Sequence, residues 1–290
     1  MKIYFNESEN QGYNFWILLL FGILVLLSQL VASLVVNFSY PYLSFKNSTF
    51  LFALSSFLEL LFFLASFYFF VVKVMNLKFS TFRIVRPKGY IYWSVVALLL
   101  PASVVIFYLC FIDGNFSIGN KYSIVSYIAF AIKLSVTAGI TEELLFRGYL
   151  MKIIEVRWNK IVGVIGPSIV FALLHMLKGM DITSVVQLFI GGLIVGIMFS
   201  LITLYTQSVW NAVIVHVIWN FMIIGVFSIS ADGKYRSIFN YVLNSNNYFI
   251  TGGDYGIEVG APAIIGYIIV IGLAFIWSRF NSQKSECSRH

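Results

Sequence analysis

Runs of about 20 apolar residues recur along nearly the whole chain, and they leave it few possible folds. A helix of about 20 residues crosses a hydrocarbon core of about 30 Å, and lipid accepts only helices and closed barrels. We interpret eight runs as membrane-spanning helices. They cover approximately residues 15–37, 50–73, 91–112, 124–150, 161–177, 183–206, 208–228 and 259–278. The sequence therefore predicts an all-α, polytopic helical bundle of about eight transmembrane helices, in which the fourth run is long enough for two helices and the fifth is short.

Only 11% of the residues are charged, against about 25% in soluble domains, and this excludes a soluble globular protein. The first 14 residues lack the basic head and small-residue cleavage site of a signal peptide, so the first run is expected to remain as an anchor. Cys110 and Cys287 lie far apart in the chain and indicate neither a disulfide framework nor a cysteine metal site.

The chain has a net charge of +7. Its basic residues are distributed as the positive-inside rule describes, under which cytoplasmic loops are rich in Lys and Arg. With eight spans and both termini in the cytoplasm, twelve basic residues fall on the cytoplasmic side and five on the other, while Lys133 and Arg147 lie within a span. The excess is thus explained by a multi-pass protein of the cell membrane. The expected partners are the lipid bilayer and a membrane-associated substrate, with no nucleic acid.

The chain is predicted to form a single integral membrane domain over residues 1–290. Its expected parts are three N-terminal spans (1–122), a core (123–228), an extracytoplasmic loop (229–258) and a last span with a cytoplasmic tail (259–290). The polar stretch from Ser228 to Glu258 is interpreted as a solvated connection, with a substrate-binding lid as the alternative. No clear internal repeat is present, which argues against a transporter built from inverted halves.

Small residues four apart, Gly192, Gly196 and Ser200 with Gly191 beside them, allow two helices to approach closely. We expect them to pack within the bundle, rather than to form a dimer face. The oligomeric state does not follow from the sequence.

Glu142 and Glu143 stand within the fourth apolar run, where ionisable groups are costly unless they pair or do chemistry. Neighbouring residues on a helix point about 100° apart, so the two carboxylates are expected to do different work. Arg147 follows Glu143 by four residues, which predicts an ion pair within one helical turn. Glu142 then points elsewhere into the bundle, where a carboxylate in apolar surroundings suits a general base acting on water.

His175 and His216 each stand alone in an apolar run, where a single histidine is most simply a hydrogen-bonded packing residue. Together with an unpaired glutamate they suggest one site instead. Asn220 lies four residues after His216, so both could aim donors at one oxygen, and Phe171 lies four residues before His175 as an aromatic wall. The remaining buried acid, Glu59, is interpreted as the partner of a polar group on a neighbouring helix, with a substrate contact as the alternative.

Two mechanisms use this set of side chains. In one, two histidines and a glutamate bind Zn²⁺, which lowers the pKa of a bound water that attacks a peptide carbonyl. In the other, Glu142 and His175 activate water directly, while His216 and Asn220 stabilise the oxyanion. The chain lacks the His-Glu-x-x-His spacing of many zinc proteases and the Gly-x-Ser-x-Gly motif of serine hydrolases.

Three motifs in order, Glu142-Glu143-x-x-x-Arg147, Phe171-x-x-x-His175 and His216-x-x-x-Asn220, resemble the signature of the CPBP family. This family comprises CAAX prenyl endopeptidases of the Ras-converting type and bacterial bacteriocin-processing or immunity proteins, also called Abi. The resemblance covers about 80 residues, from 141 to 220.

The resemblance implies an eight-helix intramembrane endopeptidase. It assigns the activation of water to Glu142 and His175, the oxyanion site to His216 and Asn220, and a supporting role to Glu143 and Arg147. Members are often labelled metalloproteases, yet the favoured glutamate mechanism requires no cofactor. A zinc ion, if present, would be held by Glu142, His175 and His216.

The sequence thus favours an endopeptidase that cleaves a membrane-associated peptide or protein by water activated at Glu142 and His175. Two alternatives come from other classes. One is a non-catalytic bacteriocin immunity or membrane scaffold protein, for which the surface loops matter more than the motifs. The other is a proton-coupled transporter with Glu59, Glu142 and the histidines as its relay.

Overall fold

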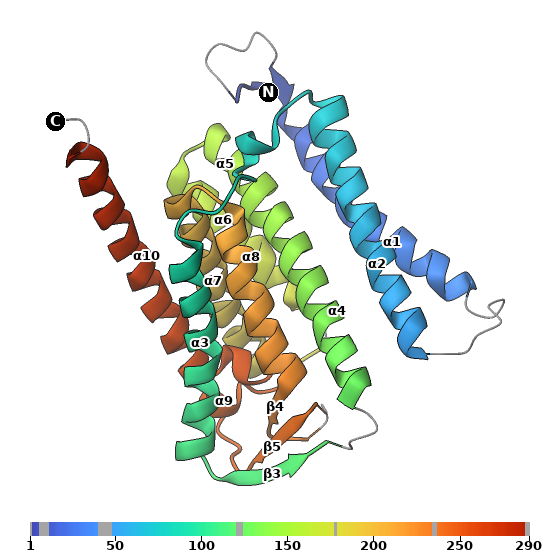
Figure 1. Ribbon diagram of the computed structural model, residues 1–290, viewed down its shortest axis with the longest axis vertical. Coiled ribbons are helices and arrows are strands. Elements are labelled where there is room, and N and C mark those ends of the chain that lie inside the picture. The colour runs from blue at the N-terminus through green and yellow to red at the C-terminus, as the bar shows by residue number, and fades with distance from the viewer. Residues whose placement is uncertain are drawn as a thin grey trace.

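The computed structural model describes residues 2–5, 12–39, 48–119, 124–176, 179–233 and 237–287. It is a bundle of helices with a small sheet at one end (Figure 1). The helices are α1 Phe15–Ser39, α2 Ser48–Tyr68, α3 Tyr90–Phe111, α4 Ile124–Glu143, α5 Met151–Arg157, α6 Lys160–His175, α7 Ile182–Thr206, α8 Val209–Asn220, α9 Tyr248–Thr251 and α10 Ala261–Cys287. The strands are β1 Lys2–Ile3, β2 Tyr13–Asn14, β3 Gly114–Ile118, β4 Phe227–Ser230 and β5 Phe239–Leu243.

The helical bundle confirms the predicted fold class, but within the described residues fewer than eight helical segments are long and apolar enough to cross a membrane. Within the described residues, six helical segments are long and apolar enough to cross a membrane: Leu54–Val74, Tyr90–Phe111, Ile124–Arg157, Ile182–Thr206, Val209–Val226 and Ala261–Asn281. The apolar segments Phe15–Ser28 and Lys160–His175 are shorter. The latter, α6, begins after Asn159, whose side chain caps the helix by accepting a hydrogen bond from the Val162 amide.

The fourth apolar run forms one helical segment rather than two, but its hydrogen bonding changes midway. Directly after Glu143, α4 passes into a π-helical stretch, η5 Leu144–Leu150, before continuing as α5. The same happens directly after Asn220, where α8 continues as η6 Phe221–Val226. π-helical turns inside α-helices are frequent at functional sites. Both changes directly follow a motif residue, whereas a third π-helical stretch, η2 Phe69–Val74, continues α2 and follows none.

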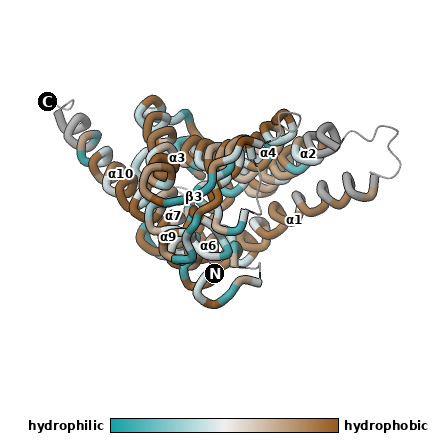
Figure 2. The backbone as a smooth tube through the Cα atoms, turned by 90° about the horizontal axis from the view of Figure 1, so that it is seen from below, coloured by the Kyte–Doolittle hydropathy of each residue, from teal (hydrophilic) through white to brown (hydrophobic). Residues whose placement is uncertain are grey.

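Large apolar side chains cover the outside of the helices. Phe111, Ile161 and Ile182 are each 70% exposed or more, and hydrophobic residues dominate the tube along the helices (Figure 2). Water would disfavour so much exposed apolar surface, whereas lipid does not. The chain is therefore a multi-pass membrane protein.

Small residues bring the motif-bearing helices together. A Cβ atom on Gly139 would lie 2.5 Å from the Val217 side chain, so α4 and α8 are in very close contact there. A Cβ on Gly196 would lie 2.8 Å from that of Ser168, and the Ser168 and Ser200 hydroxyls are 3.5 Å apart, which joins α7 to α6. The prediction of packing within the bundle for the small residues of α7 is confirmed.

We call the sheet and the chain around it the cap, comprising the described residues of 114–118 and 227–258. The strands lie in the order β3-β5-β4, with β3 antiparallel and β4 parallel to β5. The short helices α9 and η7 Ile257–Val259 complete it. The polar stretch interpreted as a solvated connection is thus largely folded and closes one end of the bundle (Figure 1).

Hydrogen bonds fasten the cap to the ends of α3 and α7. Tyr241 Oη donates to the Ile112 carbonyl at 2.7 Å, and Tyr108 Oη donates to the Ile250 carbonyl at 2.5 Å. At the start of α7, Asp181 caps the helix, and the Asp181 amide donates to the Asp254 carboxylate at 3.1 Å. A hydrogen bond from the Ser184 hydroxyl is the main reason that the pKa of Asp181 falls to about 2.

Strand β1 and the C-terminal end of α10 lie at the end of the bundle opposite the cap (Figure 1). Which side of the membrane this end occupies stays a prediction. The basic residues assigned to the non-cytoplasmic side, together with His290, lie outside the described residues: Lys46, Lys121, Lys178, Lys234 and Arg236.

Candidate active site

A cavity of about 1110 Å³ lies between the bundle and the cap. Its wall is formed by residues of α4, α6, α7, α8, η6, α10 and the cap. It includes five of the seven motif residues: Glu142, Phe171, His175, His216 and Asn220. Three motifs separated by dozens of residues thus meet at one cavity, as the hypothesis of a single site requires.

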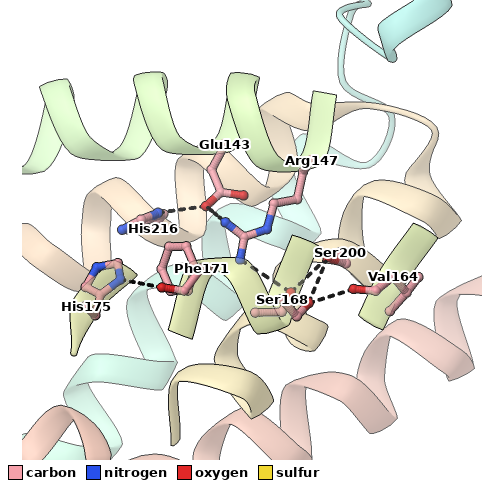
Figure 3. A network of polar contacts seen from close by, with 9 residues as sticks. Glu143, Arg147, Val164, Ser168, Phe171, His175, Ser200 and His216 are labelled. Carbon is pink, nitrogen blue, oxygen red and sulfur yellow. Dashed lines mark hydrogen bonds and ion pairs between the residues drawn. The ribbon is translucent and has the colours of Figure 1, made fainter. Parts of the chain in front are cut away.

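The other two motif residues, Glu143 and Arg147, form the predicted ion pair behind the cavity wall. Arg147 Nη1 lies 2.8 Å from Glu143 Oε1, and both side chains are completely buried. The Glu143 Oε1 atom also lies 2.8 Å from His216 Nδ1, which comes from α8 (Figure 3). Arg147 Nη2 donates to the Gly196 carbonyl of α7 at 3.4 Å. One carboxylate oxygen therefore ties α4 to α8, and its arginine partner extends the link to α7.

Two phenylalanines flank this network. The Arg147 guanidinium carbon lies 4.6 Å from the ring centre of Phe171 and 5.1 Å from that of Phe199. Phe199 also stacks on His216 at 4.9 Å with the two rings 15° from parallel. Such contacts stabilise a buried cation and restrict the orientation of the rings.

The histidine tautomers follow from their partners. His175 Nδ1 lies 2.8 Å from the Phe171 carbonyl oxygen, and a carbonyl can only accept. Nδ1 therefore carries the proton, and in the neutral ring Nε2 has the free lone pair. The same reasoning holds for His216, whose Nδ1 faces the ion-paired carboxylate of Glu143. Its Nε2 atom can donate a hydrogen bond only when the ring is a cation.

Glu142 lies on another side of α4 from Glu143. It lines the large cavity and also a second one of about 390 Å³, and His175 is in the wall of both. Glu142 is within electrostatic range of His216 and Arg147. The two residues expected to activate water are thus close to the same empty space.

Asn220 lines the large cavity and is only 7% exposed. It lies one helical turn beyond His216 on α8, as the spacing predicted. An amide in such a position supplies two donors and one acceptor. A polar group of a ligand in the cavity could therefore bind there.

The hypothesis of a metal site finds no support in the arrangement of the ligands. Among the described residues, no three side chains of His, Cys, Asp or Glu are grouped so that they could hold a metal ion. Glu142, His175 and His216 therefore do not form a ready-made zinc site.

Glu59 has a structural partner, as expected. Its carboxylate lies 3.9 Å from Lys133 Nζ of α4 and accepts a hydrogen bond from Ser55 Oγ at 2.8 Å. This pair links α2 to α4 beside the smaller cavity, which both residues line.

Sequence reasoning missed two features of the site. It assigned His216 to the oxyanion site but did not predict its contact with Glu143. The signal was the presence of a histidine and a glutamate in two different apolar segments, since each buried polar group needs a partner. It also missed Phe199, for which no local motif exists. The sequence favours a solvated connection for Ser228–Glu258, with a substrate-binding lid as the alternative, whereas several residues of this stretch line the cavity.

Comparison with known proteins confirms the resemblance predicted from the motifs. Residues 124–222 match the family model of Rce1-like proteins, described as Type II CAAX prenyl endopeptidase Rce1-like. The matched segment begins with α4, ends within η6, and contains all seven motif residues. No curated protein matches the chain.

Proposed function

We propose that the protein is an intramembrane endopeptidase that hydrolyses a peptide bond in a membrane-associated peptide or protein. The observation that carries the proposal is the convergence of Glu142, His175, His216 and Asn220 on one cavity within a chain segment similar to CAAX prenyl endopeptidases. The cavity of about 1110 Å³ is slightly larger than the range of about 300–1,000 Å³ for small-molecule sites, and this suits a length of peptide.

In the proposed reaction a water molecule lies between Glu142 and His175. Glu142 removes one proton from the water as its oxygen attacks the scissile carbonyl carbon. His175 orients the water through the lone pair on Nε2, because its Nδ1 proton is bound to the Phe171 carbonyl. The proton then passes to the leaving amine as the tetrahedral intermediate collapses. Every atom needed is present in the substrate, the water and these side chains.

Asn220 and His216 stabilise the developing oxyanion. Asn220 donates from its amide, and His216 donates from Nε2 as an imidazolium whose other proton is held by Glu143. Removing one donor of an oxyanion hole typically slows catalysis by about 10²–10³-fold. Glu143 and Arg147 do not touch the substrate, and act by holding His216 in place.

The test compares cells that express the wild-type protein with cells that express Glu142→Gln at matched abundance. Terminal-selective mass spectrometry of membrane proteins and peptides should find new termini only with the wild type. Asp113→Asn is the control, because it also neutralises one carboxylate, its side chain is exposed and it lies outside the cavity wall, so it should retain cleavage. Identical profiles for wild type and Glu142→Gln, with both folded in the membrane, would overturn the proposal and favour the non-catalytic immunity or scaffold function.

Metal dependence is tested separately on the purified protein. Cleavage is expected to persist after prolonged dialysis against a chelator. Loss of cleavage on chelation, with recovery on adding zinc, would overturn the metal-free mechanism but not the peptidase.

A further inference from the structure

Strand β4 lies at the edge of the cap sheet and next to the cavity. It pairs with β5 from Phe227 opposite Phe239 to Ser230 opposite Val242. In the strand order β3-β5-β4, no described strand pairs with the other edge of β4. An edge strand presents backbone N–H and C=O groups that can pair with another extended chain.

The cavity follows this edge of β4 rather than one face of the sheet. Side chains alternate between the two faces of a strand, so a cavity over one face would be lined by every second residue. Instead five consecutive residues, 228–232, line the cavity, while no residue of β3 or β5 does. The β4 residues Ser228, Ile229 and Ser230 are at most 9% exposed, and the cavity that they line lies inside the protein, between the cap and the helices.

The same wall continues without a break to the candidate catalytic residues. After Asn220, the chain runs through η6, where Ile223 and Ile224 line the cavity, and then directly into β4. A chain laid along β4 would therefore extend towards Asn220 and His216.

The cap also holds β4 in place before any ligand arrives. β5 is fastened to β3, and the Asn244 amide after it donates to the Asp113 carbonyl at 2.9 Å. The Trp219 indole of α8 donates to the Glu258 carboxylate of the cap at 3.1 Å. A rigid edge loses little entropy when a peptide pairs with it.

We propose that β4 is the substrate-binding strand: an extended segment of the peptide substrate pairs, through main-chain hydrogen bonds, with the edge of β4 that no described strand occupies. This inference rests on the proposed peptidase function and adds how the substrate is held. Recognition through the backbone gives affinity with little dependence on the substrate side chains at the paired positions. Only every second residue of a paired strand directs its backbone groups towards the partner, so alternate substrate amides face β4.

The first test uses internally quenched ten-residue peptides, centred on a cleavage site mapped with the wild-type protein, that carry a single N-methyl group at successive positions. N-methylation removes one N–H donor. Cleavage is expected to fall roughly tenfold or more at alternate positions and to change little between them. Equal rates at all positions, or an equal loss at every position, would overturn the inference. Ser117→Ala is the control, because it changes an exposed side chain of β3 that does not line the cavity, and it should cleave the unmodified peptide at close to the wild-type rate.

The second test locates the peptide on β4 itself. Ser230→Cys is introduced with Glu142→Gln, which prevents turnover, and with Cys110→Ser and Cys287→Ser, which remove the native thiols. The same peptides carry one cysteine at successive positions. A disulfide requires Cβ atoms about 3.5–4.5 Å apart, so one position should cross-link far more than its neighbours. No preferred position would overturn the inference.

The two proposals fail in different ways. If the wild-type protein cleaves no peptide or protein, the proposed function falls and the role of β4 falls with it. If it cleaves but the N-methyl scan shows no alternation, only the role of β4 falls.

Discussion

The two faces of α4 that carry Glu142 and Glu143 differ sharply. Glu143 is completely buried and lies 2.8 Å from both Arg147 and His216, with Arg147 between two aromatic rings. Glu142, its neighbour in the chain, faces two cavities. The Glu143 carboxylate is engaged in contacts within the bundle, while the Glu142 carboxylate has space beside it for a water molecule and a substrate.

This difference teaches which charged residues hold the bundle and which can react. A buried carboxylate needs partners, and its loss leaves the remaining charges uncompensated. A carboxylate beside a cavity can exchange protons with a ligand. Each of the following substitutions tests this division.

The largest expected effect on stability comes from Glu143→Gln. It leaves the Arg147 charge without its partner in the apolar interior, and breaking a buried pair in this way costs about 3–5 kcal/mol. Thermal unfolding of the purified protein in detergent measures it. Glu142→Gln is the matched control and should unfold close to the wild-type temperature, although it is inactive.

The double variant Glu143→Gln, Arg147→Met sharpens this result. Removing both charges together is expected to recover most of the lost stability, because Arg147 no longer leaves an uncompensated charge in the apolar interior. Cleavage should stay low, since His216 still lacks the carboxylate that orients it. A single Glu143→Gln variant as stable as the wild type would contradict the structural role of this face.

A smaller effect is expected for Phe171→Leu. It removes the ring that lies 4.6 Å from the Arg147 guanidinium, a contact that contributes about 0.5–2 kcal/mol. Phe63→Leu is the control, since Phe63 is fully buried and its ring has no cationic partner among the described residues. Unfolding should show Phe171→Leu to be the more destabilised, and an equal loss in both would mean that packing alone explains it.

The smallest effect concerns the anchor of the cap at Asp181. Because its pKa in the folded protein is about 2, below the ordinary value of 3.8, its ionised form stabilises the fold above pH 4, and this contribution is lost as the pH falls towards 2. Asp181→Asn lacks this dependence. Between pH 5 and pH 2.5, the unfolding temperature of the wild type should therefore fall more than that of the variant. Parallel curves would show that the interaction does not contribute.

Much of the site could be predicted because its residues are exceptional in apolar surroundings. Glu143 and Arg147 lie four residues apart, so local helix geometry alone predicts their contact. His175 and Phe171, and likewise His216 and Asn220, follow the same rule. The bond between Glu143 and His216 could not be predicted in this way, because 73 residues separate them and only the packing of α4 against α8 joins them.

The cap was the least predictable part. Ser228–Glu258 is polar and rich in Asn and Gly, a composition shared by loops and by short strands joined by turns. Its sheet depends on pairing between β3 and β5, which are more than 120 residues apart, so no local pattern reports it.

The sequence by itself determined that this chain crosses a membrane as helices. In lipid the backbone N–H and C=O groups must hydrogen-bond within the protein, and apart from a closed barrel only a helix allows this. It also determined which few polar residues could do chemistry, because each is costly in apolar surroundings and needs a reason to be there. Only the tertiary structure decided the contact between Glu143 and His216, the tautomer of His216 and the place of β4 beside the cavity. These depend on which helices and strands pack together, and such contacts between distant segments are set by the whole fold.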